Sequence, residues 1–215
     1  MKIRLLSMAF ACLLTVPVFA DTGGNSGGDG GAITDNDPAG VTSIVSISDN
    51  EIIQDLTFSV EGLNHSFIGD LIITVSHSTS GKSATLMNRV GTGVGAPDGD
   101  SSDLNGTYSF ADGAGSIWSE AANGDTNYEL TPGTYAASGA GESAVDLASI
   151  FAGETTQGDW TFTISDNNGG ETGSFTQTSI AFTSVAVPEP GAMATIVLGT
   201  LFGGVYFRKR QQKSA

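Results

Sequence analysis

Apolar and polar residues alternate along several short stretches of the chain, and this alternation predicts β-strands. Residues 56–61 (LTFSVE) and 160–165 (WTFTIS) alternate strictly, and residues 41–48 (VTSIVSIS) alternate in part. Residues 71–75 (LIITV) form a nearly continuous apolar run, and residues 175–184 (FTQTSIAFTS) predict a last strand. A period of two places every second side chain on one face of a sheet. Clusters of Gly, Asn and Asp separate these runs, which is typical of an all-β antiparallel sandwich or jelly roll.

Two further segments of the same region depart from the strand pattern. Residues 145–151 (VDLASIF) place apolar side chains at helical spacing and predict one or two helical turns. Residues 91–105 are polar and rich in Gly and Asp, which predicts a long loop.

The first 20 residues have the pattern of a signal peptide. Lys2 and Arg4 precede the apolar stretch 5–14, and residues 18–20 (VFA) offer a site for signal peptidase before Asp21. Cys12, the single cysteine, lies inside the apolar stretch and not at its end, so lipidation is not expected. The exported part would then contain no disulfide, and its core or bound cations must stabilise it.

Residues 187–215 form a second terminal segment with three parts. A Pro-Glu-Pro tripeptide is followed by the apolar run 191–207, which is at the short end for a membrane helix, and then by a basic cluster. The arrangement resembles the PEP-CTERM sorting signal, in which an exosortase recognises the tripeptide. The resemblance implies a precursor held transiently in the inner membrane and then sorted to the cell surface or the medium. The alternative is an ordinary C-terminal anchor. The motif residues are Pro188, Glu189, Pro190, Arg208, Lys209 and Arg210.

The region between the two ends is strongly acidic. Residues 21–186 contain 22 Asp and Glu, against Lys82 and Arg89 as the basic residues. Such a charge argues against nucleic acid and anionic membrane surfaces as partners. Either the protein is simply an acidic exoprotein, or it uses calcium. Residues 21–31 contain Gly, Asn, Ser, Asp and Thr without an apolar side chain, which predicts a disordered linker before a domain at 32–186.

Five segments of this domain resemble the P domain, also called P/Homo B, which follows the catalytic domain of kexin- and furin-like subtilases. The segments are 33–41 (ITDNDPAGV), 65–75 (HSFIGDLIITV), 110–114 (FADGA), 147–166 and 173–175 (GSF). The resemblance implies a jelly-roll β-sandwich, and it admits calcium as a cofactor. The chain departs from the family at residues 177–178 (QT), where a Trp is usual. The motif positions are His65, Gly69, Asp70, Gly153, Glu154 and Trp160.

Each motif residue also has an ordinary structural role. Gly69 and Asp70 are expected to form a turn whose carboxylate accepts backbone N–H bonds. Trp160 is expected to fill the core, and Glu154 to pair with backbone or with Arg89. His65 and His77, the two histidines, are expected to be structural or surface residues.

Three oxygen-rich turns are candidates for Ca²⁺, which takes about six to eight oxygen ligands from flexible loops. None has the spacing of an EF-hand, and zinc has little support because cysteine is missing from the exported part. Asp, Asn and Gly are also ordinary turn residues. The candidate ligands are Asp35 and Asp37 in the first turn, Asp98, Asp100 and Asp103 in the second, and Asp166 and Asn168 in the third.

No catalytic residue is predicted. In the family that the domain resembles, serine proteolysis belongs to a preceding catalytic domain, and here only a linker is predicted before residue 32. Two functions remain. The chain is either an exported surface or matrix protein that binds extracellular polysaccharide or protein, or a protease-associated module that supports a separate secreted subtilisin-like protease. The sequence does not identify the ligand, because its pattern predicts neither an aromatic platform nor a basic pocket.

Overall fold

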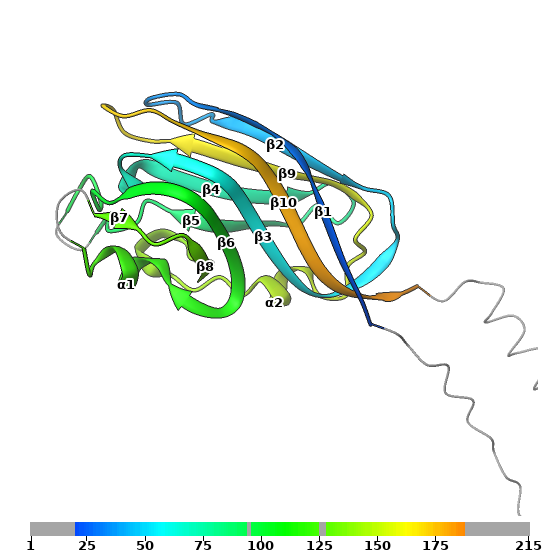
Figure 1. The fold of residues 1–215 in the computed structure, drawn as a ribbon. Helices are drawn as coiled ribbons and strands as arrows, with labels where there is room; N and C mark the ends of the chain where they lie inside the picture. Colours follow the sequence, from blue (N-terminus) through cyan, green and yellow to red (C-terminus); the bar gives the residue numbers. More distant parts are fainter. Residues whose placement is uncertain (1–19, 94–95, 125–127, 188–215) are drawn as a thin grey trace, which may run out of the picture.

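The computed structural model describes residues 20–93, 96–124 and 128–187, which form two packed β-sheets and a few short helices (Figure 1). The signal peptide and the membrane helix predicted at the two ends lie outside these residues. No helix in the described ranges is long and apolar enough to cross a membrane. The prediction of a mostly β, sandwich-like fold is confirmed.

In the large sheet, β10 lies between the edge strand β1 and β3. Figure 1 shows the orange strand β10 between the blue strand β1 and the cyan strand β3. The pairs β1–β10, β10–β3 and β3–β6 are antiparallel, whereas the short strands β7 and β8 run parallel to β6. In spatial order the strands are β1 (Ala20–Ile33), β10 (Gly173–Ala186), β3 (Glu51–His65), β6 (Asp103–Ser116) and β7 (Glu129–Leu130), with β8 (Gly133–Ala136) also on β6.

The small sheet has four strands and is antiparallel throughout. Its order is β2 (Val41–Ile47), β9 (Gly158–Asp166), β4 (Leu71–His77) and β5 (Ser83–Asn88). Four short helical segments lie in the connections: η1 (Ile68–Asp70), α1 (Ile117–Ala121), η2 (Ala140–Glu142) and α2 (Leu147–Phe151). The helix predicted at 145–151 is confirmed as α2. Asp146 caps it by accepting a hydrogen bond from the Ser149 N–H at 2.7 Å.

Aromatic side chains fill the space between the sheets. Phe58 from the large sheet lies 5.6 Å from Trp160 and 5.9 Å from Phe162 of the small sheet, and 5.8 Å from Phe151 of α2, measured between ring centroids. Trp160 is fully buried, as predicted, and its indole N–H donates to the Thr156 carbonyl. All described core residues lie between Ile33 and Phe182, so residues 20–187 contain their own hydrophobic core and are expected to fold as a unit.

Residues 21–31 are part of strand β1 and not the disordered linker that their composition predicted. The register with β10 runs from the Ala20–Val185 pair to the Ile33–Gly173 pair. Glycine is needed here for close packing. A Cβ atom on Gly28 would lie 2.1 Å from Thr178 Oγ1, and one on Gly30 would lie 2.4 Å from a backbone carbonyl of β10. The sandwich therefore begins well before residue 32.

Candidate functional site: a buried acidic cluster

Buried polar residues gather at the end of the sandwich that lies away from the last residues of β10. Here β3 ends at His65, η1 leads into β4, and β9 ends at Asp166. The register brings these ends together, because Leu71 pairs with Asp166 and His65 pairs with Gly173. Three polar side chains of this end, His65, Asp70 and Asp166, are at most 1% exposed.

His65 and Asp166 form a buried pair. The His65 Nε2 atom lies 3.0 Å from Asp166 Oδ2, and both side chains are fully enclosed. The Phe67 N–H lies 3.2 Å from His65 Nδ1, which can accept its hydrogen bond while Nε2–H donates to the carboxylate. Asp166 Oδ1 also accepts from the Asn168 N–H at 3.1 Å. His65 is therefore structural, as predicted, and it fixes the orientation of Asp166.

Asp70 is the unusual member of this cluster. Its side chain is fully buried, yet among the described residues neither carboxylate oxygen has a hydrogen-bond partner of normal geometry. Burial raises the pKa of Asp70 to about 6; the Asn168 amide opposes this, and the charges of Asp166 and Glu171 add to it. The prediction that this carboxylate accepts backbone N–H bonds is wrong. The η1 turn is closed by the backbone itself, since Asp70 N–H donates to the Phe67 carbonyl.

The two basic residues of the domain are engaged elsewhere. Lys82 forms an ion pair with Glu154, whereas the prediction paired Glu154 with backbone or with Arg89. Arg89 Nε donates to the Gly69 carbonyl at 3.0 Å. Within the described ranges, neither side chain forms an ion pair with Asp70.

Two of the three predicted metal-binding turns meet in the fold. Asp35 Oδ1 accepts a hydrogen bond from the Gly170 N–H at 2.8 Å, which joins the first turn to the turn after β9. The turn after β9, the third of the predicted turns, carries Asn168 and Glu171, whose side chains affect the pKa of Asp70. Asp37 instead closes its own turn, because its Oδ1 accepts from the Ala39 N–H at 3.1 Å.

The predicted turn with Asp98, Asp100 and Asp103 packs on the cluster through its backbone. Gly69 N–H donates to the Asp100 carbonyl at 3.0 Å, while the Asp100 carboxylate accepts from Ser102. Asp98 is exposed, and Asp103 belongs to β6, so the loop is shorter than predicted. In the described part of the chain no group of three His, Cys, Asp or Glu side chains is arranged to hold a metal ion. Carboxylates alone therefore do not form a site, and any cation site would also need amide and carbonyl oxygens.

His77 lies at the opposite end of the sandwich and forms a serine–histidine pair that sequence analysis missed. Its Nδ1 atom lies 3.0 Å from Ser80 Oγ, and its Nε2 atom lies 3.0 Å from the Gln157 carbonyl. The ring is 1% exposed and stacks on Trp160 at 4.0 Å. Burial lowers its pKa, so the ring is neutral at pH 7. Ser80 Oγ also accepts from the Lys82 N–H, so this pair closes a tight turn.

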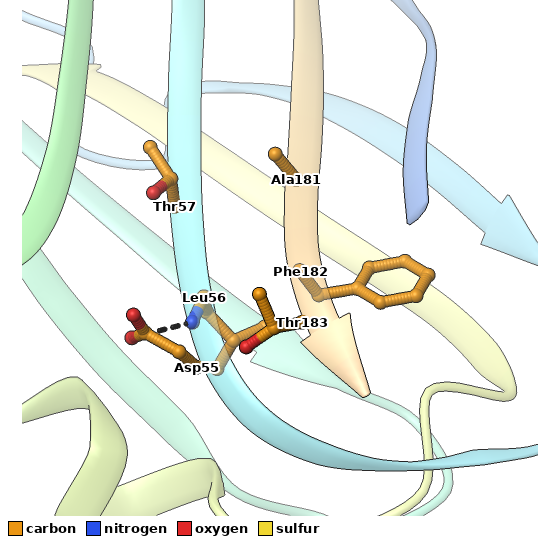
Figure 2. Close-up of a pocket in the computed structure, with 6 residues that line it drawn as sticks. All are labelled: Asp55, Leu56, Thr57, Ala181, Phe182 and Thr183. Carbon is orange, nitrogen blue, oxygen red and sulfur yellow. Dashed lines mark hydrogen bonds between the residues drawn. The ribbon is translucent and has the colours of Figure 1, made fainter. Parts of the chain in front are cut away.

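Two hollows on the surface of the described residues are candidate binding sites. One of about 170 Å³ lies between β3 and β10 on the large sheet. Figure 2 shows its six lining residues, with the Asp55 carboxylate turned back to the Leu56 N–H and the Phe182 ring pointing away from Asp55. The Leu56 N–H donates to Asp55 Oδ1 at 2.9 Å. The other, of about 350 Å³, is bounded by Trp118, Asp100 and Glu142 among others. The Trp118 indole is buried and donates to Ser138, so neither hollow presents an open aromatic platform.

Comparisons with known proteins give a family match and several similar solved chains, among them two from Aeromonas sobria. The crystal structure of the Aeromonas sobria serine protease with the chaperone ORF2 is 14% identical, with a TM-score of 0.44 over 80% of this chain and 28% of that chain. The crystal structure of the A. sobria serine protease is 15% identical, with a TM-score of 0.43 over 79% and 28% of the two chains. The chain thus spans just over a quarter of these protease chains. No curated protein matches it.

The family match lies at the C-terminal end. Residues 186–211 match the model of the PEP-CTERM protein-sorting motif. The match includes the Pro-Glu-Pro tripeptide at 188–190 and the basic cluster at 208–210, as predicted. The motif implies export, processing by an exosortase and sorting to the cell surface. The chain therefore carries a PEP-CTERM sorting signal directly after its β-sandwich.

Proposed function

We propose that this protein is a non-catalytic module of the cell surface or extracellular matrix, delivered there by an exosortase. The observation that carries the proposal is the position of the sorting motif. It begins at residue 186, the last residue of β10, and its Pro-Glu-Pro follows two residues later. Cleavage at the tripeptide would remove the tail and leave every strand of the sandwich intact.

The experiment that tests delivery is the substitution Glu189→Ala in the bacterium that makes the protein. We expect the full-length precursor to accumulate in the membrane fraction, because the recognition tripeptide is lost. Glu129→Ala, a change of the same kind at an exposed position of β7, is the matched control and should be processed normally. If the Glu189 variant is processed and exported like the wild type, residues 187–215 act only as an anchor.

We further propose that the sandwich is a jelly roll of the P/Homo B type. Successive segments of the chain cross between the two sheets: β1, β3, β6 and β10 lie in the large sheet, and β2, β4, β5 and β9 in the small one. The motif residues also have structural roles in this fold. Trp160 fills the core, and Gly69 packs so closely against residues 98–100 that a Cβ would lie 2.6 Å from a backbone oxygen.

The proposal that the module is non-catalytic rests on its two histidines. A general base must reach the proton that it removes from a substrate or nucleophile. His65 is enclosed and held by Asp166, and His77 is enclosed between Trp160 and a tight turn. In the part of the chain that the structure describes, the serine–histidine hydrogen bond is at Ser80, and this serine closes that turn.

The outer face of the small sheet supports a neutral polysaccharide as the ligand. Cross-strand pairing aligns four threonines in one row and places a second, mostly hydroxyl row beside it. Hydroxyl groups can donate and accept hydrogen bonds to sugar hydroxyls. The rest of the domain is acidic and would repel an anionic polymer. The rows are Thr42, Thr163, Thr74 and Thr85, and Ile44, Thr161, Ser76 and Ser83.

Co-sedimentation with the producer's own matrix tests this ligand. Purified residues 20–187 should bind the matrix, and the double substitution Thr74→Glu/Thr163→Glu should abolish binding, because it places two charges in the central row. Thr57→Glu puts one such charge on the outer face of the large sheet and should leave binding intact, whereas Thr74→Glu or Thr163→Glu alone should weaken it. Glycosidase treatment of the matrix should remove binding. If protease treatment removes it instead, the ligand is a protein, and a secreted protease becomes the first candidate to test.

A further inference from the structure

We propose that Asp70 anchors a binding site for one divalent cation, Ca²⁺ by its ligand chemistry, between η1 and the turn that follows β9. The first observation is the state of the Asp70 carboxylate. It is 0% exposed, and neither of its oxygens has a hydrogen-bond partner of normal geometry among the described residues. An unpaired carboxylate in a protein interior is strongly unfavourable, so it needs a proton or a positive charge beside it.

The second observation is that the domain has no side chain to supply that charge. Lys82 and Arg89 are the two basic residues between 21 and 187, and they bind Glu154 and the Gly69 carbonyl respectively. His65, the remaining cationic candidate, already donates to Asp166. Besides burial, the charges of Asp166 and Glu171 raise the pKa of Asp70, and the smaller opposing effect of His65 does not offset them. A cation from solution is therefore the partner that the fold itself lacks.

Several groups around Asp70 carry oxygen atoms that could bind a cation. Asp166 is buried beside it, and the following turn brings the amide of Asn168 and the carboxylate of Glu171. The same turn is tied to Asp35 through the Gly170 N–H. Irregular turns with carboxylate, amide and carbonyl oxygens suit Ca²⁺, whereas Mg²⁺ requires a near-ideal octahedron, and Zn²⁺ prefers nitrogen and sulfur ligands.

Thermal unfolding of purified residues 20–187 tests the proposal with Ca²⁺ as the probe. For the wild type we expect millimolar Ca²⁺ to raise the melting temperature by several degrees over EDTA, since a ligand that binds only the folded state stabilises it. Asp70→Asn keeps the side-chain shape and removes its charge. In EDTA this variant should melt at or above the wild-type temperature, and Ca²⁺ should no longer raise it.

The controls separate the site from general charge screening. Asp98→Asn removes an exposed carboxylate in the neighbouring loop and should keep the full response to Ca²⁺. NaCl at equal ionic strength should give a smaller shift than Ca²⁺, and titration calorimetry should find one Ca²⁺ per chain. Should Asp70→Asn fail to fold, Glu171→Gln takes its place and should raise the half-saturating Ca²⁺ concentration. A Ca²⁺ response that survives in these variants, or that NaCl reproduces, would overturn the proposal and leave Asp70 as a buried neutral acid.

Discussion

The hydroxyl groups of Ser43 and Thr178 lie 2.8 Å apart in the interior of the sandwich and join its two sheets. Ser43 belongs to β2 of the small sheet, Thr178 belongs to β10 of the large sheet, and both side chains are at most 2% exposed. A hydrogen bond between two side chains therefore links the sheets inside the largely apolar core.

Thr178→Val tests this hydrogen bond. Valine keeps the shape of threonine but leaves the Ser43 hydroxyl buried and unpaired, so we expect a loss of about 1–3 kcal/mol in the free energy of unfolding. Urea unfolding of residues 20–187 measures it. The double variant Ser43→Ala/Thr178→Val should lose less than the sum of the two single variants, because no hydroxyl is then left unpaired. Additive losses would show that the two hydroxyls are not coupled.

Gly28→Ala tests the assignment of residues 21–31 to a strand. A Cβ atom at this position would lie 2.1 Å from Thr178 Oγ1 and 2.4 Å from Ser43 Oγ. We expect a destabilisation of about 1–3 kcal/mol from overpacking, together with faster hydrogen exchange along β1. The same change at Gly115, where no atom lies within 4 Å of the added Cβ, is the control and should be nearly neutral. Equal effects at the two positions would contradict the packing of β1.

The stability of the domain should fall as the pH is lowered through the titration range of histidine. Burial lowers the pKa of His77 below 6.5, against the opposing effects of the Gln157 carbonyl and Glu154. A histidine whose pKa is lowered in the folded state contributes stability above its unfolded pKa, and this contribution is lost as the pH falls.

Urea unfolding between pH 8 and pH 5 measures this loss. The titration should be done in the Asp70→Asn background, because the raised pKa of Asp70 has the opposite sign. His77→Gln should lower stability at every pH and flatten the slope. A slope that persists without His77 must come from another group.

Purified residues 20–187 should not hydrolyse casein or esterase substrates, with or without Ca²⁺. Both histidines are buried, and Ser80 is engaged by its own turn. Activity that survives stringent purification and is lost in both Ser80→Ala and His77→Gln would refute the non-catalytic proposal. Loss in Ser80→Ala alone, with His77→Gln still active, would exclude the histidine as the base but still identify an enzyme.

The sequence predicts the strands that carry a recognisable pattern of apolar side chains. Strands β2, β3, β4, β9 and β10 each carry an alternating or continuous apolar pattern, and each is found close to its predicted position. Strand β1 could not be predicted in this way. Its glycines have no side chains to alternate, and its pairing depends on backbone hydrogen bonds and on the shape of β10.

The candidate site was predicted only in part. The oxygen-rich turns around Asp35 and Asp166 were identified from composition, but their contact through Gly170 depends on residues 135 positions apart. Asp70 was assigned a turn role because it follows a glycine. Its lack of a partner arises from tertiary packing, since η1 closes with its own backbone and the 98–102 loop covers Gly69. The one available signal was a carboxylate inside the apolar segment 67–73 (FIGDLII).

Strand β10 also determines how the module would bear a mechanical load. It is hydrogen-bonded to β1 on one side and to β3 on the other along nearly its full length, and its last residues lead directly into the sorting tail. If the end that cleavage leaves after β10 is attached to the cell surface and the domain is bound to matrix, tension would enter along the axis of β10. Extraction of the strand then has to shear two ladders of hydrogen bonds at once, whereas an edge strand could be peeled away one bond at a time. The placement of β10 therefore suits a protein that is pulled by its C-terminal end.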